Sequence, residues 1–169
     1  MSHDESPRVA LITGASRGIG LAIATRLGRK GHHLVLNGTD AAALATAALE
    51  VEQATGARVV QAPGDVSDTD AVQSVVSAAR DHFGRLDVLV NNAAISLRVA
   101  GRPPTLENTP VEHWDRMLAV NLKGPFLVTK SAVPLMKLHG WGRIVFVGSI
   151  GARMVTGNTS LPYASAKAG

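Results

Sequence analysis

The sequence predicts an α/β fold with a doubly wound parallel sheet, and three features indicate it. Short apolar runs alternate with amphipathic stretches five times along the chain. The apolar runs are continuous, which is typical of parallel strands buried on both faces by helices. The first run leads directly into the glycine-rich segment T-G-A-S-R-G-I-G, residues 13–20, which would join a strand to a helix.

Five short apolar runs are predicted as strands, because they are rich in β-branched residues and too short for helices. In chain order these strands are residues 8–13, 33–37, 57–62, 85–92 and 143–149.

Helical spacing and capping residues predict the first two helices. Apolar side chains recur at helical spacing over residues 18–30, and Gly31 supplies the stop. After the second strand, Asp40 can cap an alanine-rich helix that ends near Gly56.

The second half of the chain carries two further helical stretches. Ser67 or Asp68 starts a helix that runs to about Phe83. A loop at 96–108 then precedes a long helical region at 111–138. With right-handed crossovers, this order of elements gives a Rossmann-type fold. The sequence has no repeat, low-complexity tract or linker, so residues 1–169 are expected to form one domain.

Composition excludes several classes of protein. The absence of cysteine rules out disulfides and thiolate metal sites, and we expect no metal centre. The polar start is unlike a signal peptide, and no apolar stretch approaches the roughly 20 residues of a membrane span, so a cytoplasmic protein is expected. The formal charge of +4 comes from scattered basic residues, which favours an anionic cofactor over a nucleic-acid partner.

The glycines of residues 13–20 have separate structural roles in a nucleotide-binding turn. Gly14 allows a sharp turn after the strand, and Gly18 lets the backbone approach a pyrophosphate at the helix N-terminus. Gly20 lets the helix pack closely on the strand. A glycine triplet between the first strand and the first helix therefore predicts a dinucleotide site.

The chain resembles the short-chain dehydrogenase/reductase family in six motifs that occur in the family's order. They are the glycine pattern at 14–20, D-V at Asp65–Val66, N-N-A at Asn91–Ala93, Asn121, Ser149, and Y-x-x-x-K at Tyr163–Lys167. The family commonly continues N-N-A with glycine, where this chain has Ala94.

The resemblance implies a catalytic set of Asn121, Ser149, Tyr163 and Lys167. Hydride transfer to a ketone leaves an alkoxide that needs a proton, which a tyrosine hydroxyl can donate when a nearby cation favours its ionised form. Lys167 lies four residues after Tyr163, on the same face of a helix, and in the family it also holds the nicotinamide ribose. Ser149 is expected to hydrogen-bond the substrate carbonyl, and Asn121 to hold a water linking Lys167 to solvent.

The cofactor is expected to be NADP, with NAD as the alternative. Nicotinamide dinucleotide sites that select NAD place an acidic residue at the end of the second strand, where this chain has Gly38 and Thr39. Arg17 in the glycine turn is a cation suited to a 2′-phosphate. Asp40, two residues displaced, either caps the next helix or turns towards the ribose.

Other cofactor contacts follow from the resemblance. Asp65 and Val66 would frame the adenine, while Asn91, Ala93 and Ile95 would line the cofactor channel or brace the central strand. The complete predicted set is Gly14, Ser16, Arg17, Gly18, Ile19, Gly20, Gly38, Thr39, Asp65, Val66, Asn91, Ala93, Tyr163 and Lys167.

These residues predict an NADP(H)-dependent oxidoreductase of small carbonyl or alcohol substrates, most similar to 3-oxoacyl-(acyl carrier protein) reductases. The alternatives are an NAD(P)-binding protein without turnover, or an inactive fragment of the reductase. The family's pattern continues with further strands and a substrate-covering segment, so the chain is expected to be truncated after the Tyr163–Lys167 motif. The resemblance also implies a homodimer or homotetramer formed through residues 111–138 and the helix at Tyr163.

Overall fold

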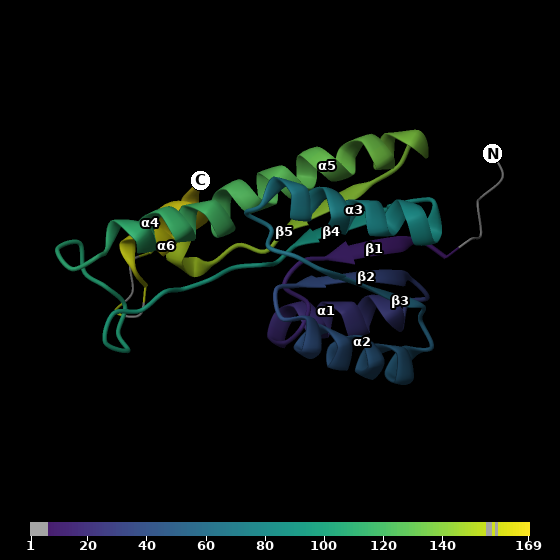
Figure 1. Cartoon of the computed structure of the whole chain (residues 1–169), viewed down its shortest axis with the longest axis horizontal. Helices are drawn as coiled ribbons and strands as arrows, with labels where there is room; N and C mark the ends of the chain where they lie inside the picture. The colour runs from purple at the N-terminus through teal and green to yellow at the C-terminus, as the bar shows by residue number, and fades with distance from the viewer. Residues whose placement is uncertain (1–6, 155–156, 158) are drawn as a thin grey trace.

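The protein, described by a computed structural model over residues 7–154, 157 and 159–169, has the predicted doubly wound architecture (Figure 1). Its five parallel strands follow the order β3-β2-β1-β4-β5. The strands are β1 (Val9–Ile12), β2 (His33–Gly38), β3 (Val59–Pro63), β4 (Val88–Asn91) and β5 (Arg143–Phe146).

Helices cover both faces of this sheet. On one face lie α1 (Gly18–Gly28) and α2 (Ala41–Thr55), and on the other lie α3 (Thr69–Phe83) and α5 (Gly124–Leu138) (Figure 1). The helix α4 (Val111–Leu118) precedes α5, and α6 (Leu161–Ala168) lies beside α4.

Strand β1 is the centre of the core, because helices bury it from both sides. Val9 and Leu11 pack into the cluster that includes α3 and α5. Ala10 and Ile12 point to the opposite face and pack into the cluster formed with α1 and α2. The side chains of all four residues are buried, which confirms the prediction of a two-sided core for this strand.

The edge strand β5 differs from that prediction. Val145 and Phe146 are 47% and 60% exposed, because β5 pairs only with β4 among the described residues. The buried two-sided pattern therefore holds for the centre of the sheet and not for this edge.

The predicted helix starts and stops are largely confirmed. Asp40 accepts a hydrogen bond from the Ala43 amide and caps α2, which ends at Gly56 with positive φ. Asp68, the second of the two candidates, caps α3 through the Ala71 amide. Helix α1 ends at Gly28, two residues earlier than predicted.

The region 111–138 is helical throughout, but it is not a single α-helix. A π-helical segment, η1 (Ala119–Lys123), joins α4 to α5 and contains Asn121. The sequence pattern gave no indication of this change in winding, since apolar spacing continues across it.

Four of the five strands are shorter than predicted, and the largest differences are at the start of β4 and the end of β5. The Asp87 carboxylate, rather than a ladder carbonyl, accepts the Val9 amide, so β4 begins only at Val88. After Phe146 the Val147 amide still donates to the Asn91 carbonyl, and Ser149 then caps a short 3₁₀ turn, η2 (Ile150–Ala152), through the Gly151 amide. No helix among the described residues has the length and apolar character to cross a bilayer.

The Asp87 carboxylate is a buried polar group at the amino-terminal ends of the strands β1 and β4. Besides the Val9 amide at 2.8 Å, it accepts two hydrogen bonds from Arg85, each 2.9 Å long. Asp87 is fully buried and the Arg85 side chain is 17% exposed. Removing one partner of a buried pair leaves the other charge without compensation, which is costly.

We expect the Asp87→Ala variant to lose about 3 kcal/mol of unfolding free energy, because Arg85 and the Val9 amide lose their acceptor. The matched control is Asp81→Ala, which breaks the exposed Arg80–Asp81 pair and should cost less than about 1 kcal/mol. Urea denaturation of both variants checks this, and equal losses would contradict the structural role given to Asp87.

Candidate active site

A cleft of about 400 Å³ opens at the carboxyl ends of β1, β2, β3 and β4. It contains most of the predicted cofactor residues, although they come from separate parts of the chain. Those that line it are Gly14, Ser16, Arg17, Gly18, Ile19, Gly38, Thr39, Asp65, Val66 and Ala93. Ile95, expected to line the cofactor channel or brace the central strand, also lines this cleft. Further lining residues had no predicted role at the cofactor, namely Asn37, Gly64, Asn92, Ala94, Arg116 and Val120.

The glycine turn has the geometry that its sequence predicts. Gly14 has φ +64°, and a Cβ there would lie 2.8 Å from the Ala93 Cα. Gly20 lies beneath the turn, where a Cβ would overlap the Gly14 carbonyl oxygen. Gly18, with φ +59°, begins α1 and has open space where a side chain would stand.

A hydrogen-bond network ties this turn to the end of β4. The Thr13 hydroxyl accepts hydrogen bonds from the Asn92 and Ala93 amides, both 3.0 Å long. The Asn92 side-chain amide donates to the Thr13 and Gly14 carbonyl oxygens. Thr13 belongs to the glycine-rich segment and Asn92 to the N-N-A motif, but the sequence predicted no role for either side chain.

The end of β2 lacks an acidic side chain in the cleft. Asn37 is buried and donates to the Ala62 and Gly64 carbonyls, which fixes the ends of β2 and β3 together. Asp40 is used as the cap of α2, which agrees with the first of its two predicted roles. The exposed Arg17, in the turn before α1, lines the same cleft.

Asp65 is the acidic residue among those that line the cleft, and its carboxylate is held by three donors. The Ser67 amide and hydroxyl donate to Oδ1 at 2.9 and 2.7 Å, and Arg116 donates to Oδ2 at 2.5 Å. Burial opposes its ionisation, but the hydrogen bonds from Ser67 and Arg116 outweigh it and lower the pKa of the Asp65 carboxyl.

The predicted catalytic residues lie on η1, η2 and α6, which pack together. Asn121 is buried in the π-helical segment, and its side-chain amide exchanges two 2.8 Å hydrogen bonds with the Ile95 backbone. Ser149 and Tyr163 are half-buried at the start of η2 and in the first turn of α6.

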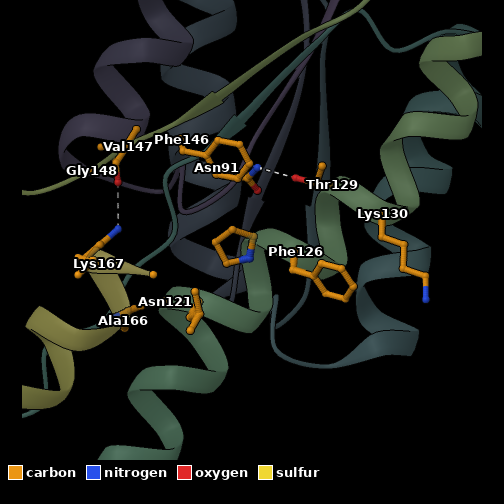
Figure 2. A pocket seen from close by; sticks show the side chains of 14 residues that line it. Asn91, Asn121, Phe126, Thr129, Lys130, Phe146, Val147, Gly148, Ala166 and Lys167 are labelled. Carbon is orange, nitrogen blue, oxygen red and sulfur yellow. Dashed lines mark hydrogen bonds between the residues drawn. The ribbon is translucent and has the colours of Figure 1, made fainter. Parts of the chain in front are cut away.

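Lys167 shares α6 with Tyr163, as predicted, and makes its hydrogen bond to the backbone. Its ammonium donates to the Val147 carbonyl oxygen at 3.0 Å (Figure 2). Among the described residues it makes no hydrogen bond to Tyr163, although one short helix carries both. Burial lowers the pKa of the Lys167 ammonium, since desolvation disfavours its charged form.

A second cavity of about 550 Å³ lies between α5, η1, β5 and α6 (Figure 2). Lys167 and Asn121 line it, together with apolar side chains such as Phe126 and Phe146. Asn91 also lines this cavity rather than the cleft, and its side-chain amide donates to Thr129 on α5. This contact supports the bracing alternative for Asn91.

The cleft fits the nicotinamide dinucleotide expected from the sequence. The open side of Gly18 leaves room for a phosphate against the first turn of α1, where backbone amides are unpaired. Arg17 adds a cation beside it. Gly20 does not line the cleft, and its predicted role is to let α1 pack closely against the turn.

Comparison with known proteins identifies similar chains. The family model described as short chain dehydrogenase matches residues 8–169. D-beta-hydroxybutyrate dehydrogenase of Rhizobium meliloti is 38% identical over 84% of this chain and 54% of its own length. The 3-oxoacyl-[acyl-carrier-protein] reductase of Synechocystis is 37% identical over 96% of this chain and 63% of its own length.

Solved structures show the same similarity. L-sorbose reductase of Gluconobacter frateurii, complexed with NADPH and L-sorbose, has a TM-score of 0.89 at 32% identity, covering 96% of this chain and 60% of that one. NAD+-bound xylitol dehydrogenase has a TM-score of 0.88 at 30% identity, covering 97% of this chain and 61% of that one. The chain therefore spans about half to two thirds of the length of these relatives.

Gly18→Ala should weaken nucleotide binding about tenfold or more, because the methyl group enters the open side of the cleft. The residue's positive φ also predicts a loss of about 1–2 kcal/mol in unfolding free energy. Gly84→Ala at the end of α3 is the matched control, since Gly84 has φ +70° and equally open surroundings outside the cleft. Titration with NADPH and urea denaturation should give similar stability losses but impaired binding only for Gly18→Ala; impaired binding in both would contradict the assignment.

The lowered pKa of Lys167 predicts a pH-dependent stability. Between that lowered value and the ordinary value of 10.5, the unfolded chain binds more protons than the folded one, so stability rises with pH across this window. We expect the unfolding free energy of the wild type, measured relative to Lys167→Met, to increase between pH 7 and pH 10. Other groups cancel in this difference, and a pH-independent difference would show that Lys167 is not desolvated.

Proposed function

The chain belongs to the short-chain dehydrogenase family, and we propose that the protein is an NADP(H)-dependent oxidoreductase that interconverts a carbonyl compound and a secondary alcohol. The observation that carries this proposal is the cleft built on the glycine turn, which gathers predicted dinucleotide contacts from four strand ends. The helix α6, which carries Tyr163 and Lys167, begins beyond the same end of the sheet.

In the proposed reaction the bound cofactor supplies a hydride to the carbonyl carbon, or takes one from the alcohol. The Tyr163 hydroxyl donates a proton to the carbonyl oxygen in reduction and accepts it back in oxidation. Ser149 holds that oxygen by a hydrogen bond, so that charge developing on it is stabilised.

Lys167 and Asn121 are proposed to support Tyr163. An ammonium on the same helix face favours the ionised form of the tyrosine hydroxyl that follows proton donation. Lys167 is also proposed to hold the ribose hydroxyls next to the nicotinamide. Asn121, fixed by the Ile95 backbone, is proposed to hold a water through which protons reach Lys167 from solvent.

Two observations favour NADP over NAD as the cofactor. The end of β2 presents Gly38 and Thr39 to the cleft, while the nearby Asp40 is committed to capping α2. Arg17 supplies a positive charge for a 2′-phosphate. Asp65 and Val66, at the end of β3, remain the proposed contacts to the adenine.

For the substrate, we propose a 3-oxoacyl or 3-hydroxyacyl compound. Two relatives are named for such compounds, one for D-beta-hydroxybutyrate and one for 3-oxoacyl-[acyl-carrier-protein]. The similar solved structures include an L-sorbose reductase and a xylitol dehydrogenase. Sugars and sugar alcohols are therefore the competing substrate class, and a substrate panel must include them.

We further propose that the protein is a homodimer or homotetramer. Leu122 and Phe126 are 40% and 61% exposed on the surface of η1 and α5, which supports association through this helical region. Leu127 and Leu135 of the same helical region instead pack towards the core. The cytoplasmic location stays a prediction.

Tyr163→Phe should lower turnover about 100-fold or more, because the variant lacks the proton that reduction requires. NADPH binding should remain within about twofold, since the ring is retained. The test follows NADPH oxidation by the full-length protein with 3-oxoacyl thioesters, ketoses and simple ketones. Full turnover by the variant would contradict the mechanism, and NADPH binding without turnover by the wild type would favour the non-catalytic alternative.

A further inference from the structure

Arg116 is a positively charged residue that lines the cleft. It belongs neither to the glycine turn nor to the catalytic motifs, so neither explains its position. It lies on α4, far in the sequence from the strand ends that form most of the cleft. Its guanidinium reaches the turn between β3 and α3 and donates to both Asp65 and Ser67, at 2.5 and 2.7 Å. The contact therefore joins two walls of the cleft.

Stability does not explain this pair well. The side chains of Arg116 and Asp65 are 42% and 31% exposed, and ion pairs this open to water contribute little to folding. The pair's location is more informative, because both residues line the cleft that fits an anionic cofactor.

The charges that line the cleft give Arg116 a specific effect. Arg17 and Arg116 are its cations and Asp65 its carboxylate, so the lining carries one net positive charge. Without Arg116 that net positive charge would vanish, and Asp65 would lose the cation with which it is paired. A phosphate monoester adds about two negative charges to a dinucleotide, so NADP(H) would lose more electrostatic attraction than NAD(H).

We propose that Arg116 is a specificity-determining residue for the cofactor's 2′-phosphate, acting as the counter-charge that makes Asp65 compatible with it. Arg116 is thus a positioning and charge-balancing residue and takes no part in hydride or proton transfer. This inference rests on the proposed function, because it assumes that the cleft binds a nicotinamide dinucleotide.

The experiment measures dissociation constants of NADPH and NADH for the full-length protein by fluorescence titration. The quantity of interest is the ratio of the NADH constant to the NADPH constant, because contacts common to both nucleotides cancel in it. Arg116→Met should lower this ratio about three- to fivefold at low salt, because NADPH carries about two more negative charges than NADH. At about 0.5 M salt the decrease should largely disappear, since salt screens interactions between charges that are exposed to solvent.

Further variants separate charge from shape. Arg116→Lys, which keeps the positive charge, should retain a ratio close to that of the wild type. Asp65→Asn alone should raise the ratio, and the double variant Asp65→Asn with Arg116→Met should return it to within about twofold of the wild type. Arg80→Met is the matched control, because Arg80 is an exposed arginine on α3 paired with Asp81 outside the cleft, and its ratio should not change.

The results discriminate among three outcomes. A lowered ratio in Arg116→Met, reversed by the second substitution, supports the inference whichever nucleotide the wild type prefers. If Arg116→Met weakens both nucleotides by the same factor, or neither, Arg116 is only a structural tie and the inference is overturned while the proposed function stands. If the wild type binds neither nucleotide, the proposed function fails and this inference fails with it.

Discussion

The hydrogen bonds of Thr13 and Asn92 are the contacts on which the site depends, because they join the ends of the two central strands. In the order β3-β2-β1-β4-β5, successive strands after β1 run outwards on one side, and β4 returns to the other. Such a reversal leaves a crevice beyond the carboxyl ends of the strands, where ligands bind in open α/β sheets. The Thr13 hydroxyl and the Asn92 amide hold the two turns at this point together, with Gly14 pressed against Ala93. The position of Gly18 and the first turn of α1 follows from that contact.

Much of the fold could be predicted from the sequence, since the decisive signals are local. A continuous apolar run marks a buried strand, and a carboxylate three residues before a backbone amide can cap a helix, as Asp40 and Asp68 do. The glycine turn is equally local, because its requirement for positive φ and close approach is met by glycines of fixed spacing. The cofactor residues proposed near this turn could therefore be predicted from the sequence alone.

Other features could not be predicted, because they depend on partners distant in sequence. The start of β4 is set by Asp87 taking the amide of Val9, 78 residues away. Arg116 meets Asp65 across 51 residues, and on α4 it reads as an ordinary exposed arginine. The π-helical winding around Asn121 leaves the apolar pattern intact, although such segments frequently occur at functional sites. In each case the structure departs from what the local sequence pattern predicts, because of a side-chain contact or a change in helical winding.

The position of Lys167 shows how the sheet can orient a residue that is not part of it. A half-buried ammonium needs an acceptor, and here the acceptor is the Val147 carbonyl rather than the side chain four residues earlier. The Val147 amide in turn donates to the Asn91 carbonyl, which holds the backbone of Val147 against the end of β4. Asn91 is held by Thr129 of α5 through its side chain. Lys167 is therefore placed by backbone geometry, and a ligand that engages its ammonium would meet a group already oriented, with less conformational freedom to lose on binding.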